Sequence, residues 1–265
     1  MYSLTNNLLF DLSEEIATVT LNRPDARNVI DYEGWLELGS LAHTLAKDPN
    51  VKAVILTGKG NEAFSAGADI KDFDLNRTDS AQAKTYAKAF DGALNAIERI
   101  PKPTISLIRG YCVGGGCELS LATDIRIAAN NSRFGIPAAR LGILVGYQEM
   151  RRLVALIGPG NTSYLLLSGR LIDAPEALRM GLINNLTSLD KIDEYAYRLA
   201  KEIVALAPMS HQGHKEILRL VQRPSSLASL PPQKKHLPYA NFDTADFKEG
   251  LMAFKERRRP KFQGL

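Results

Sequence analysis

Short β-branched runs that alternate with longer helical patterns constrain the fold of this 265-residue chain more than any other feature. Ile16–Leu21, Ala53–Thr57 and Thr104–Ile108 are apolar and rich in β-branched residues, which is typical of strands. Helical patterns follow the first run over about residues 31–47 and the second over about residues 80–99. Because strands that alternate with helices form βα units, we predict an α/β fold with a buried, partly parallel sheet.

The C-terminal part of the chain shows a different pattern, in which strand signals fade beyond Glu149. Residues 224–238 contain four prolines and are expected to form a loop. We therefore expect a core over residues 1–195 and a helical region over residues 196–265. Helices are expected near residues 149–157, 161–168, 174–180, 190–206, 208–221 and 243–256.

The composition excludes several classes of protein. With 45% hydrophobic and 23% charged residues, the chain has the composition of a globular protein. A net charge of +4 is too small to predict nucleic-acid binding, although it is compatible with a small polyanion such as a nucleotide cofactor. We find no run of about 18 apolar residues that would predict a membrane span. The N-terminus lacks the pattern of a secretory signal.

The two cysteines, Cys112 and Cys117, lie on either side of a glycine run. Neither has a second Cys or a His pair nearby, so we expect no metal site, and two cysteines cannot form a disulfide framework. Reduced thiols of this kind indicate a cytoplasmic location.

The first segment with a chemical pattern is Ala63–Lys71, in which Ala66, Gly67 and Ala68 lead to Asp69. Small side chains let a ligand approach the backbone closely, and Asp69 can cap a following helical turn. The same residues are also typical of an ordinary tight turn with a cap.

The second segment is Arg109–Leu119, in which three consecutive glycines, 114–116, follow a strand and enter a helix. The N–H groups at the start of a helix have no partner within the helix and favour an anion. Glu118 lies in the first turns of this helix, where it can also simply complement the helix dipole. Taken together, the two segments offer two backbone N–H groups, and two such donors aimed at one point form an oxyanion hole.

Both segments resemble those of one enzyme family. Phe64–Lys71 is similar to the first oxyanion-hole segment of the enoyl-CoA hydratase/isomerase (crotonase) family, and Gly110–Leu119 is similar to the second. Asn22–Pro24 resembles the family's turn that cradles coenzyme A, and residues 254–258 resemble its C-terminal helix. The resemblance implies an α/β fold, a crotonase-like spiral of ββα units, with a helical C-terminal trimerisation region.

The resemblance also implies a function. We expect an enoyl-CoA hydratase or lyase that acts on an acyl-CoA thioester, with coenzyme A as part of the substrate and no permanently bound cofactor. The implied assembly is a homotrimer or a dimer of trimers. The wall of the acyl pocket is expected from residues 72–86 and 143–148.

Site residues are implied by the same resemblance. Ala68 and Gly115 would donate their N–H groups to the thioester oxygen, and Glu118 matches the first catalytic glutamate of the hydratases. Phe254 and Arg257, near the C-terminus, would complete the coenzyme A site from the same chain or from a neighbouring subunit. The residues implied along the coenzyme A path are Arg27, Ala66, Asp69, Ile70, Lys71, Phe254 and Arg257.

The chain departs from the family at one informative position. In hydratases with two glutamates, the second follows the proline of a segment like Phe134–Pro137, and here that position is Ala138. Adding water to a double bond needs a base for the water and an acid for the α-carbon, and two carboxylates divide this work naturally.

Three explanations of Ala138 are open. Glu118 acts alone, or Glu149 or Tyr147 supplies the missing group, although we favour the simpler interpretation that Glu149 complements a helix dipole. A second explanation is another reaction at the same oxyanion hole, such as decarboxylation or double-bond isomerisation of a CoA thioester. A third is a non-catalytic acyl-CoA-binding protein. The presence of Glu118 beside both segments favours a hydratase or lyase.

Overall fold

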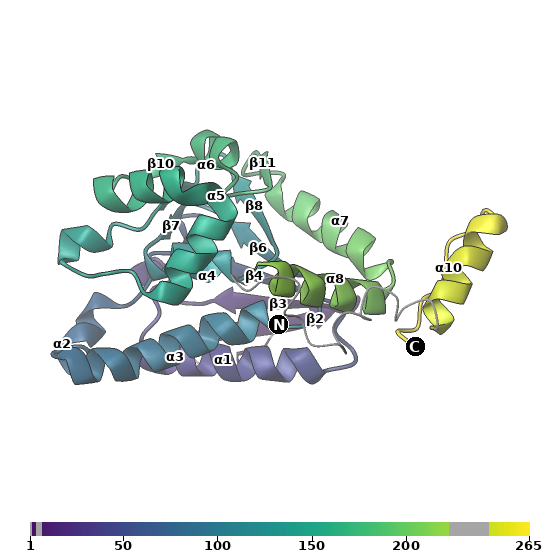
Figure 1. The fold of residues 1–265 in the computed structure, drawn as a ribbon, viewed down its shortest axis with the longest axis horizontal. Helices are drawn as coiled ribbons and strands as arrows, with labels where there is room; N and C mark the ends of the chain where they lie inside the picture. The colour runs from purple at the N-terminus through teal and green to yellow at the C-terminus, as the bar shows by residue number, and fades with distance from the viewer. Residues whose placement is uncertain (1, 4–6, 223–243) are drawn as a thin grey trace.

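Two β-sheets lie at the centre of the molecule, whose computed structural model describes residues 2–3, 7–222 and 244–265 (Figure 1). Within these residues the larger sheet has seven strands, in the order β1-β2-β3-β4-β6-β8-β11. β2 pairs antiparallel with β1 and β3, and all other neighbours in this sheet pair parallel. The strands are β1 (Tyr2–Ser3), β2 (Leu8–Ser13), β3 (Ile16–Leu21), β4 (Ala53–Gly58), β6 (Thr104–Ile108), β8 (Ile125–Ala129) and β11 (Asn185–Thr187).

The smaller sheet is built from very short strands in the order β10-β9-β7-β5. β5, β7 and β9 run parallel to one another, and β10 is antiparallel to β9. The bounds are β5 (Ala63–Ser65), β7 (Tyr111–Val113), β9 (Arg133–Gly135) and β10 (Ile172–Asp173).

Each of these short parallel strands follows a strand of the larger sheet and leads to a helix. β4 and β5 precede α3 (Ser80–Glu98), β6 and β7 precede α4 (Gly115–Leu121), and β8 and β9 precede α5 (Tyr147–Ser168). This repetition confirms the predicted ββα units. Because parallel strands end at the same edge of a sheet, the loops after β5, β7 and β9 leave from one edge and can meet there.

Helices cover both faces of the larger sheet. α1 (Tyr32–Lys47) and α3 pack against one face, and α7 (Ile192–Val204) packs against the other (Figure 1). Along β4, Val54 and Leu56 belong to the first core, whereas Ala53 and Ile55 belong to the second. A strand that is buried on both faces needs a continuous apolar run, which explains the sequence pattern.

Capping residues set the helix starts that the sequence predicts. Asp31 accepts a hydrogen bond from Gly34 N at 2.8 Å and begins α1. Asp79 accepts hydrogen bonds from the backbone N–H groups of residues 81 and 82 and begins α3. Such caps contribute about 1 kcal/mol each to helix stability.

The helices predicted separately at residues 149–157 and 161–168 are joined in α5. The predicted break is present as a kink, because Gly158 has a non-helical backbone with φ 74° and Pro159 follows it. Proline has no backbone N–H group to donate within a helix, but it suits the first turn of a new helix, where that group has no partner. The sequence thus located the interruption but not the continuity of the element.

The C-terminal helices lie close to their predicted positions. The predicted boundary at residue 195 falls inside α7, whose buried Ala196, Ala200 and Ile203 pack on the sheet. The division into two regions stays a prediction, and the loop predicted at residues 224–238 lies outside the described residues. The helices are α6 (Ala174–Met180), α8 (Pro208–Val221) and α10 (Ala245–Lys255), and the short elements are η1 (Pro24–Ala26), η2 (Ile70–Asp72), α2 (Phe73–Asn76) and η3 (Ala138–Leu141).

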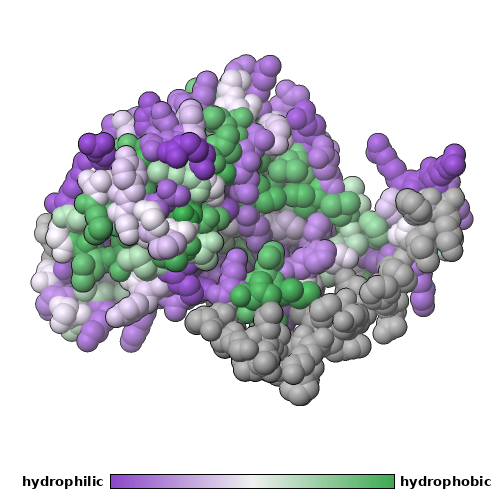
Figure 2. Space-filling model, turned by 45° about the horizontal axis from the view of Figure 1, so that its top comes forward, coloured by the Kyte–Doolittle hydropathy of each residue, from purple (hydrophilic) through white to green (hydrophobic). Residues whose placement is uncertain are grey.

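Apolar side chains are exposed where α2 and the loop before α5 lie. Figure 1 places both segments at one end of the molecule, and Figure 2 shows apolar surface at that end. Leu75 is 74% exposed, Leu144 is 92% exposed and Tyr147 is 96% exposed. Exposed apolar patches of this kind mark binding or interaction sites.

Candidate functional site

The loop after β7 turns sharply into α4 at Gly114. Gly114 has φ 55° and ψ −129°, a backbone conformation that glycine adopts without steric cost. The next turn lies so close to the neighbouring loop that a Cβ atom on Gly116 would be 2.3 Å from the carbonyl oxygen of Ser65. Glycines therefore allow the start of α4 to reach the loop after β5.

The loop after β5 is fixed by a short parallel bridge between Ile30 and Ala68. Ile30 N donates to Gly67 O at 2.8 Å, and Asp69 N donates to Ile30 O at 2.9 Å. Successive backbone groups of an extended segment point in opposite directions, so the N–H group of Ala68 faces away from Ile30.

The backbone N–H groups of Ala68 and Gly115 come together as a result. A Cβ atom on Gly115 would be 3.3 Å from Ala68 N, and one on Gly67 would be 2.7 Å from Gly115 N. Within the described residues, neither N–H donates a hydrogen bond to another residue. Gly115 is the first residue of α4, where a helix leaves its N–H groups without a partner. The two residues predicted as oxyanion donors are thus neighbours in space.

Glu118 lies in the first turns of α4 and is only 8% exposed. Burial raises the pKa of Glu118 to about 8, and the charge of Glu149 adds to this effect, whereas Arg77 acts against it. Such a carboxyl group is mostly protonated at pH 7 and still close to its titration range. This is the property that general acid–base catalysis requires.

Glu149 is buried in the first turn of α5, with 4% of its surface exposed. Its carboxyl group folds back over the helix start, because a Cβ atom on Gly146 would be 2.4 Å from Oε2 of Glu149. Burial, together with a side-chain contact to Asp91 of α3, raises the pKa of Glu149 to about 7. The helix-end position predicted for Glu149 is therefore compatible with a position in the site beside Glu118. Tyr147, the other candidate, is 96% exposed.

Arg152 fixes the start of α5 against α3. Its Nη2 atom donates to Glu98 Oε2 at 2.6 Å and to Asn95 Oδ1 at 2.7 Å. Its Nη1 atom lies 3.6 Å from Glu149 Oε1, and neither atom has a hydrogen-bond partner among the described residues. The buried positive charge of Arg152 therefore favours the ionised form of Glu149 and opposes the effect of burial.

Position 138 brings no carboxylate to this site. Ala138 is the first residue of η3, and its partly buried methyl group packs against the core. Among the described residues, the acidic groups that raise the pKa of Glu118 are Glu149 and Asp91. The acidic neighbours of Glu118 thus come from α5 and α3 and not from the segment that follows β9.

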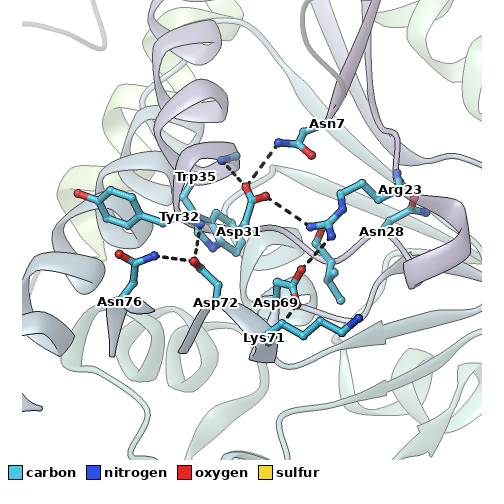
Figure 3. A network of polar contacts seen from close by, with 12 residues as sticks. Asn7, Arg23, Asn28, Asp31, Tyr32, Trp35, Asp69, Lys71, Asp72 and Asn76 are labelled. Carbon is cyan, nitrogen blue, oxygen red and sulfur yellow. Dashed lines mark hydrogen bonds and ion pairs between the residues drawn. The ribbon is translucent and has the colours of Figure 1, made fainter. Parts of the chain in front are cut away.

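Arg23 and Asp69 organise the loop predicted to carry the coenzyme A path. Figure 3 shows Arg23 between two carboxylates, with Nη2 at 2.9 Å from Asp69 Oδ2 and Nη1 at 3.5 Å from Asp31 Oδ2. Asp69 also accepts a hydrogen bond from Lys71 N at 3.1 Å and begins η2, which confirms the predicted cap. Ile70 is 59% exposed, and Lys71 is exposed as well.

Arg27 lies next to this loop, because Ala66 N donates to Arg27 O at 2.9 Å. The guanidinium of Arg27 pairs with Glu62 at 2.8 Å and lies 4.8 Å from the ring centroid of Tyr111. Both partners of this ion pair are largely exposed. An exposed ion pair contributes little stability, so another anion can replace Glu62 as the partner of Arg27 at low cost.

The structure does not bring Phe254 and Arg257 to the other candidates within one chain. α10 lies at the opposite end of the molecule from α2 (Figure 1). Arg257 follows α10 and is exposed, and the side chain of Phe254 lies outside what the structure describes. A contribution of these two residues from a neighbouring subunit stays a prediction.

Sequence reasoning missed the polar face of α3. Asp91, Asn95 and Glu98 recur at helical spacing between buried apolar residues and meet the start of α5. Polar residues three and four positions apart on an otherwise buried helix were the available signal. Arg77 lies within residues 72–86, which the sequence predicts as part of the acyl-pocket wall, but its proximity to Glu118 was not predicted, because it depends on the tertiary structure.

In the described ranges, no cluster of three or more His, Cys, Asp or Glu side chains could hold a metal ion. Among the same residues, no helix combines the length and the apolar character that crossing a membrane requires.

Comparison with known proteins links these features to one family. The profile described as enoyl-CoA hydratase/isomerase matches residues 11–264. The short-chain-enoyl-CoA hydratase of Clostridium acetobutylicum is 32% identical over 254 residues, which cover 96% of each chain. A probable enoyl-CoA hydratase of Mycobacterium tuberculosis is 36% identical over 256 residues, or 96% of this chain and 97% of that one.

A solved structure shows the same fold. The crystal structure of an enoyl-CoA hydratase/carnithine racemase from Magnetospirillum magneticum superposes with a TM-score of 0.95 at 35% identity. The superposition covers 98% of this chain and 97% of the other. The arrangement of sheets and helices is therefore shared along nearly the whole length of both chains.

Proposed function

Because this chain belongs to the enoyl-CoA hydratase/isomerase family, we propose that it adds water to the double bond of an enoyl-CoA thioester. It is an acyl-CoA-processing enzyme with the crotonase fold. The proposal names one reaction among those that a stabilised thioester enolate allows.

The first part of the proposed mechanism is charge stabilisation at the thioester oxygen. When the oxygen of water attaches to the β-carbon, the electron pair of the double bond moves to the thioester oxygen. The N–H groups of Ala68 and Gly115 would donate hydrogen bonds to that oxygen. Donors of this kind contribute about 3–4 kcal/mol each to the stability of the transition state. The charge then returns to the α-carbon, which takes up a proton.

The second part is proton transfer by two carboxyl groups. Water must lose one proton and the α-carbon must gain one, so a protonated and an ionised carboxyl group can together complete one turnover. Glu118 has a pKa of about 8 and Glu149 a pKa of about 7. Near neutral pH Glu118 would therefore hold its proton while Glu149 is partly ionised. Glu149 would thus do the work that Ala138 cannot do.

The observation that carries the proposal is the position of Glu118. It is a buried, proton-holding carboxyl group on the same helix whose first N–H group lies beside the N–H group of Ala68. A protein that only binds acyl-CoA has no need of a buried, proton-holding carboxyl group, whose ionisation destabilises the fold.

Mass spectrometry of thioester products tests the reaction. Purified protein is mixed with enoyl-, 3-hydroxyacyl- and malonyl-type CoA thioesters, and the mass of each product is measured. We expect the mass of an enoyl-CoA to increase by that of one water. In Glu118→Ala we expect no such product, although the variant should still bind the thioester. Glu33→Ala, which changes an exposed residue of α1, is the control variant. Loss of carbon dioxide, a shifted double bond, or tight binding without any product would contradict hydration.

The predicted assembly belongs to the same proposal. A homotrimer, or a dimer of such trimers, would let α10 of one subunit reach a neighbour, which agrees with its position away from the body of its own chain (Figure 1). In that arrangement Phe254 and Arg257 would complete the coenzyme A path of the neighbouring subunit. Analytical ultracentrifugation measures the mass directly, and a monomer would refute this part. The cytoplasmic location indicated by the cysteines stays a prediction.

A further inference from the structure

Arg77 directly follows α2, and its guanidinium is held between two aromatic rings. The Cζ atom lies 4.4 Å from the ring centroid of Phe73 and 4.8 Å from that of Tyr86. The two rings meet at 74° with their centroids 6.2 Å apart, so the guanidinium occupies the angle between them. Contacts of this kind use the flat face of the guanidinium and leave its N–H groups in the plane free to bind an anion.

Tyr86 is a rigid support for Arg77. Its hydroxyl oxygen accepts a hydrogen bond from Trp35 Nε1 at 2.9 Å, and the residue is only 2% exposed. Burial raises the pKa of Tyr86 to about 12, so the phenol is neutral at physiological pH. A neutral, fixed ring holds the cation without neutralising its charge.

A row of aromatic side chains connects Arg77 to the N–H group of Gly115. Phe90 lies one helical turn after Tyr86 on α3, a rise of about 6 Å. The ring of Phe90 packs edge-on against Trp35 at 4.7 Å, and its Cε2 atom would be 3.3 Å from a Cβ atom on Gly115. Arg77 therefore lies on the same side of α3 as the start of α4, which agrees with its electrostatic effect on Glu118.

The charge of Arg77 has no counter-ion among the described side chains. None of the ion pairs found among the described side chains involves Arg77. Asp72, on the preceding turn, instead accepts hydrogen bonds from Tyr32 N at 2.8 Å and Asn76 Nδ2 at 2.5 Å. Within the described side chains no hydrogen bond uses the guanidinium N–H groups of Arg77, and an anion that presents two oxygens would stabilise such a half-buried arginine.

We propose that Arg77 determines substrate specificity by binding a carboxylate at the far end of the acyl chain. The substrates would then be CoA thioesters of unsaturated dicarboxylic acids. This inference rests on the proposed function, because it places the acyl group between Gly115 and Arg77. It adds a substrate class that the oxyanion donors and Glu118 do not define.

Equilibrium binding separates this inference from catalysis. Isothermal titration calorimetry measures the affinity of the full-length protein for adipoyl-CoA, hexanoyl-CoA and free CoA. The two thioesters have six acyl carbons and differ only in the terminal carboxylate, and neither contains a double bond to hydrate. We expect adipoyl-CoA to bind about 10- to 100-fold more tightly than hexanoyl-CoA, the range typical of a hydrogen-bonded charge pair.

The variants identify the residue responsible. Arg77→Met should bring the affinity ratio of the two thioesters close to one, and Arg77→Lys should keep part of it, because lysine keeps the charge but not the two-pronged geometry. Lys88→Met removes an exposed cation from α3, the helix that contains Tyr86, and should keep the wild-type ratio.

Several outcomes would overturn the inference. Equal affinities of the wild-type protein for the two thioesters would exclude a carboxylate site. An unchanged ratio in Arg77→Met would assign the preference to another residue. If Arg77→Met lost as much affinity for free CoA as for adipoyl-CoA, Arg77 would bind the coenzyme and not the acyl chain. A failure of the proposed hydration would be visible separately, as absent product with the affinity ratio intact.

Discussion

Glu118 should make the stability of this fold fall as pH rises through the neutral range. Its pKa is about 8 in the folded chain against an ordinary value of 4.5. Between these two values the folded chain keeps a proton that the unfolded chain releases. The stability that the protonated group contributes is fully present below about pH 4.5 and is lost as pH rises through about 8.

The size of this loss follows from the difference between the two pKa values. At about 1.4 kcal/mol for each pH unit, the full loss is roughly 4–5 kcal/mol, of which roughly 3 kcal/mol falls between pH 5 and pH 8. Glu149, with its pKa raised to about 7, adds a loss of the same sign over a lower range of pH. Glu118→Gln has no proton to release at this position. The variant should therefore lose roughly 3 kcal/mol less stability than the wild-type protein between pH 5 and pH 8.

Urea unfolding at pH 5, 6.5 and 8 measures this difference. The single tryptophan, Trp35, is fully buried and reports unfolding by fluorescence. Protein concentration is held constant, because subunit association contributes to the measured stability. Glu33→Gln, an exposed glutamate of α1, is the matched control and should follow the wild-type profile. If Glu118→Gln and wild-type protein lose stability in parallel from pH 5 to pH 8, the argument from burial is wrong.

Two further predictions concern the residues around Glu118. Glu149→Gln should lower the hydration rate by about 100-fold or more and remove one limb of the pH–rate profile. Glu176→Gln, which changes an equivalent first-turn glutamate of α6, is the control and should affect only stability. Equal hydration rates in the two variants would show that Glu149 only stabilises the start of its helix. Gly67→Ala places a Cβ atom 2.7 Å from Gly115 N at a φ of 96°. We expect it to lower turnover by about 100- to 1000-fold, the effect of losing one oxyanion donor. Normal turnover in that variant, checked for folding by circular dichroism, would contradict the geometry.

The long elements could be predicted because their patterns are local. β3 and α8 have the predicted bounds, and α1 begins after the predicted cap Asp31. The three-residue strands β5, β7 and β9 could not be predicted, because alternation over three residues is indistinguishable from a loop. β2 was missed as well, although its burial alternates between Leu8 and Asp11 as expected for a strand with one face toward the core.

Site residues could be proposed from the sequence only where they lie within one short segment. Ala68, Gly115 and Glu118 belong to two short motifs, and the structure brings these motifs together. Arg152 and Arg77 act through residues that are distant in sequence, and a single sequence contains no record of those contacts. Burial of Glu149 depends in the same way on how α5 packs against α3 and α4.

The repeated ββα units divide the chemistry of this site between separable parts of the chain. The units that end in α3 and α4 provide the N–H groups of Ala68 and Gly115. The unit that ends in α5 contains both Ala138 and Glu149. A carboxylate of the third unit can therefore change its position without moving the N–H groups that we propose as donors for the thioester oxygen. In the proposed mechanism, substitutions within a single unit would change the proton-transfer groups while the groups proposed to recognise the thioester stay in place.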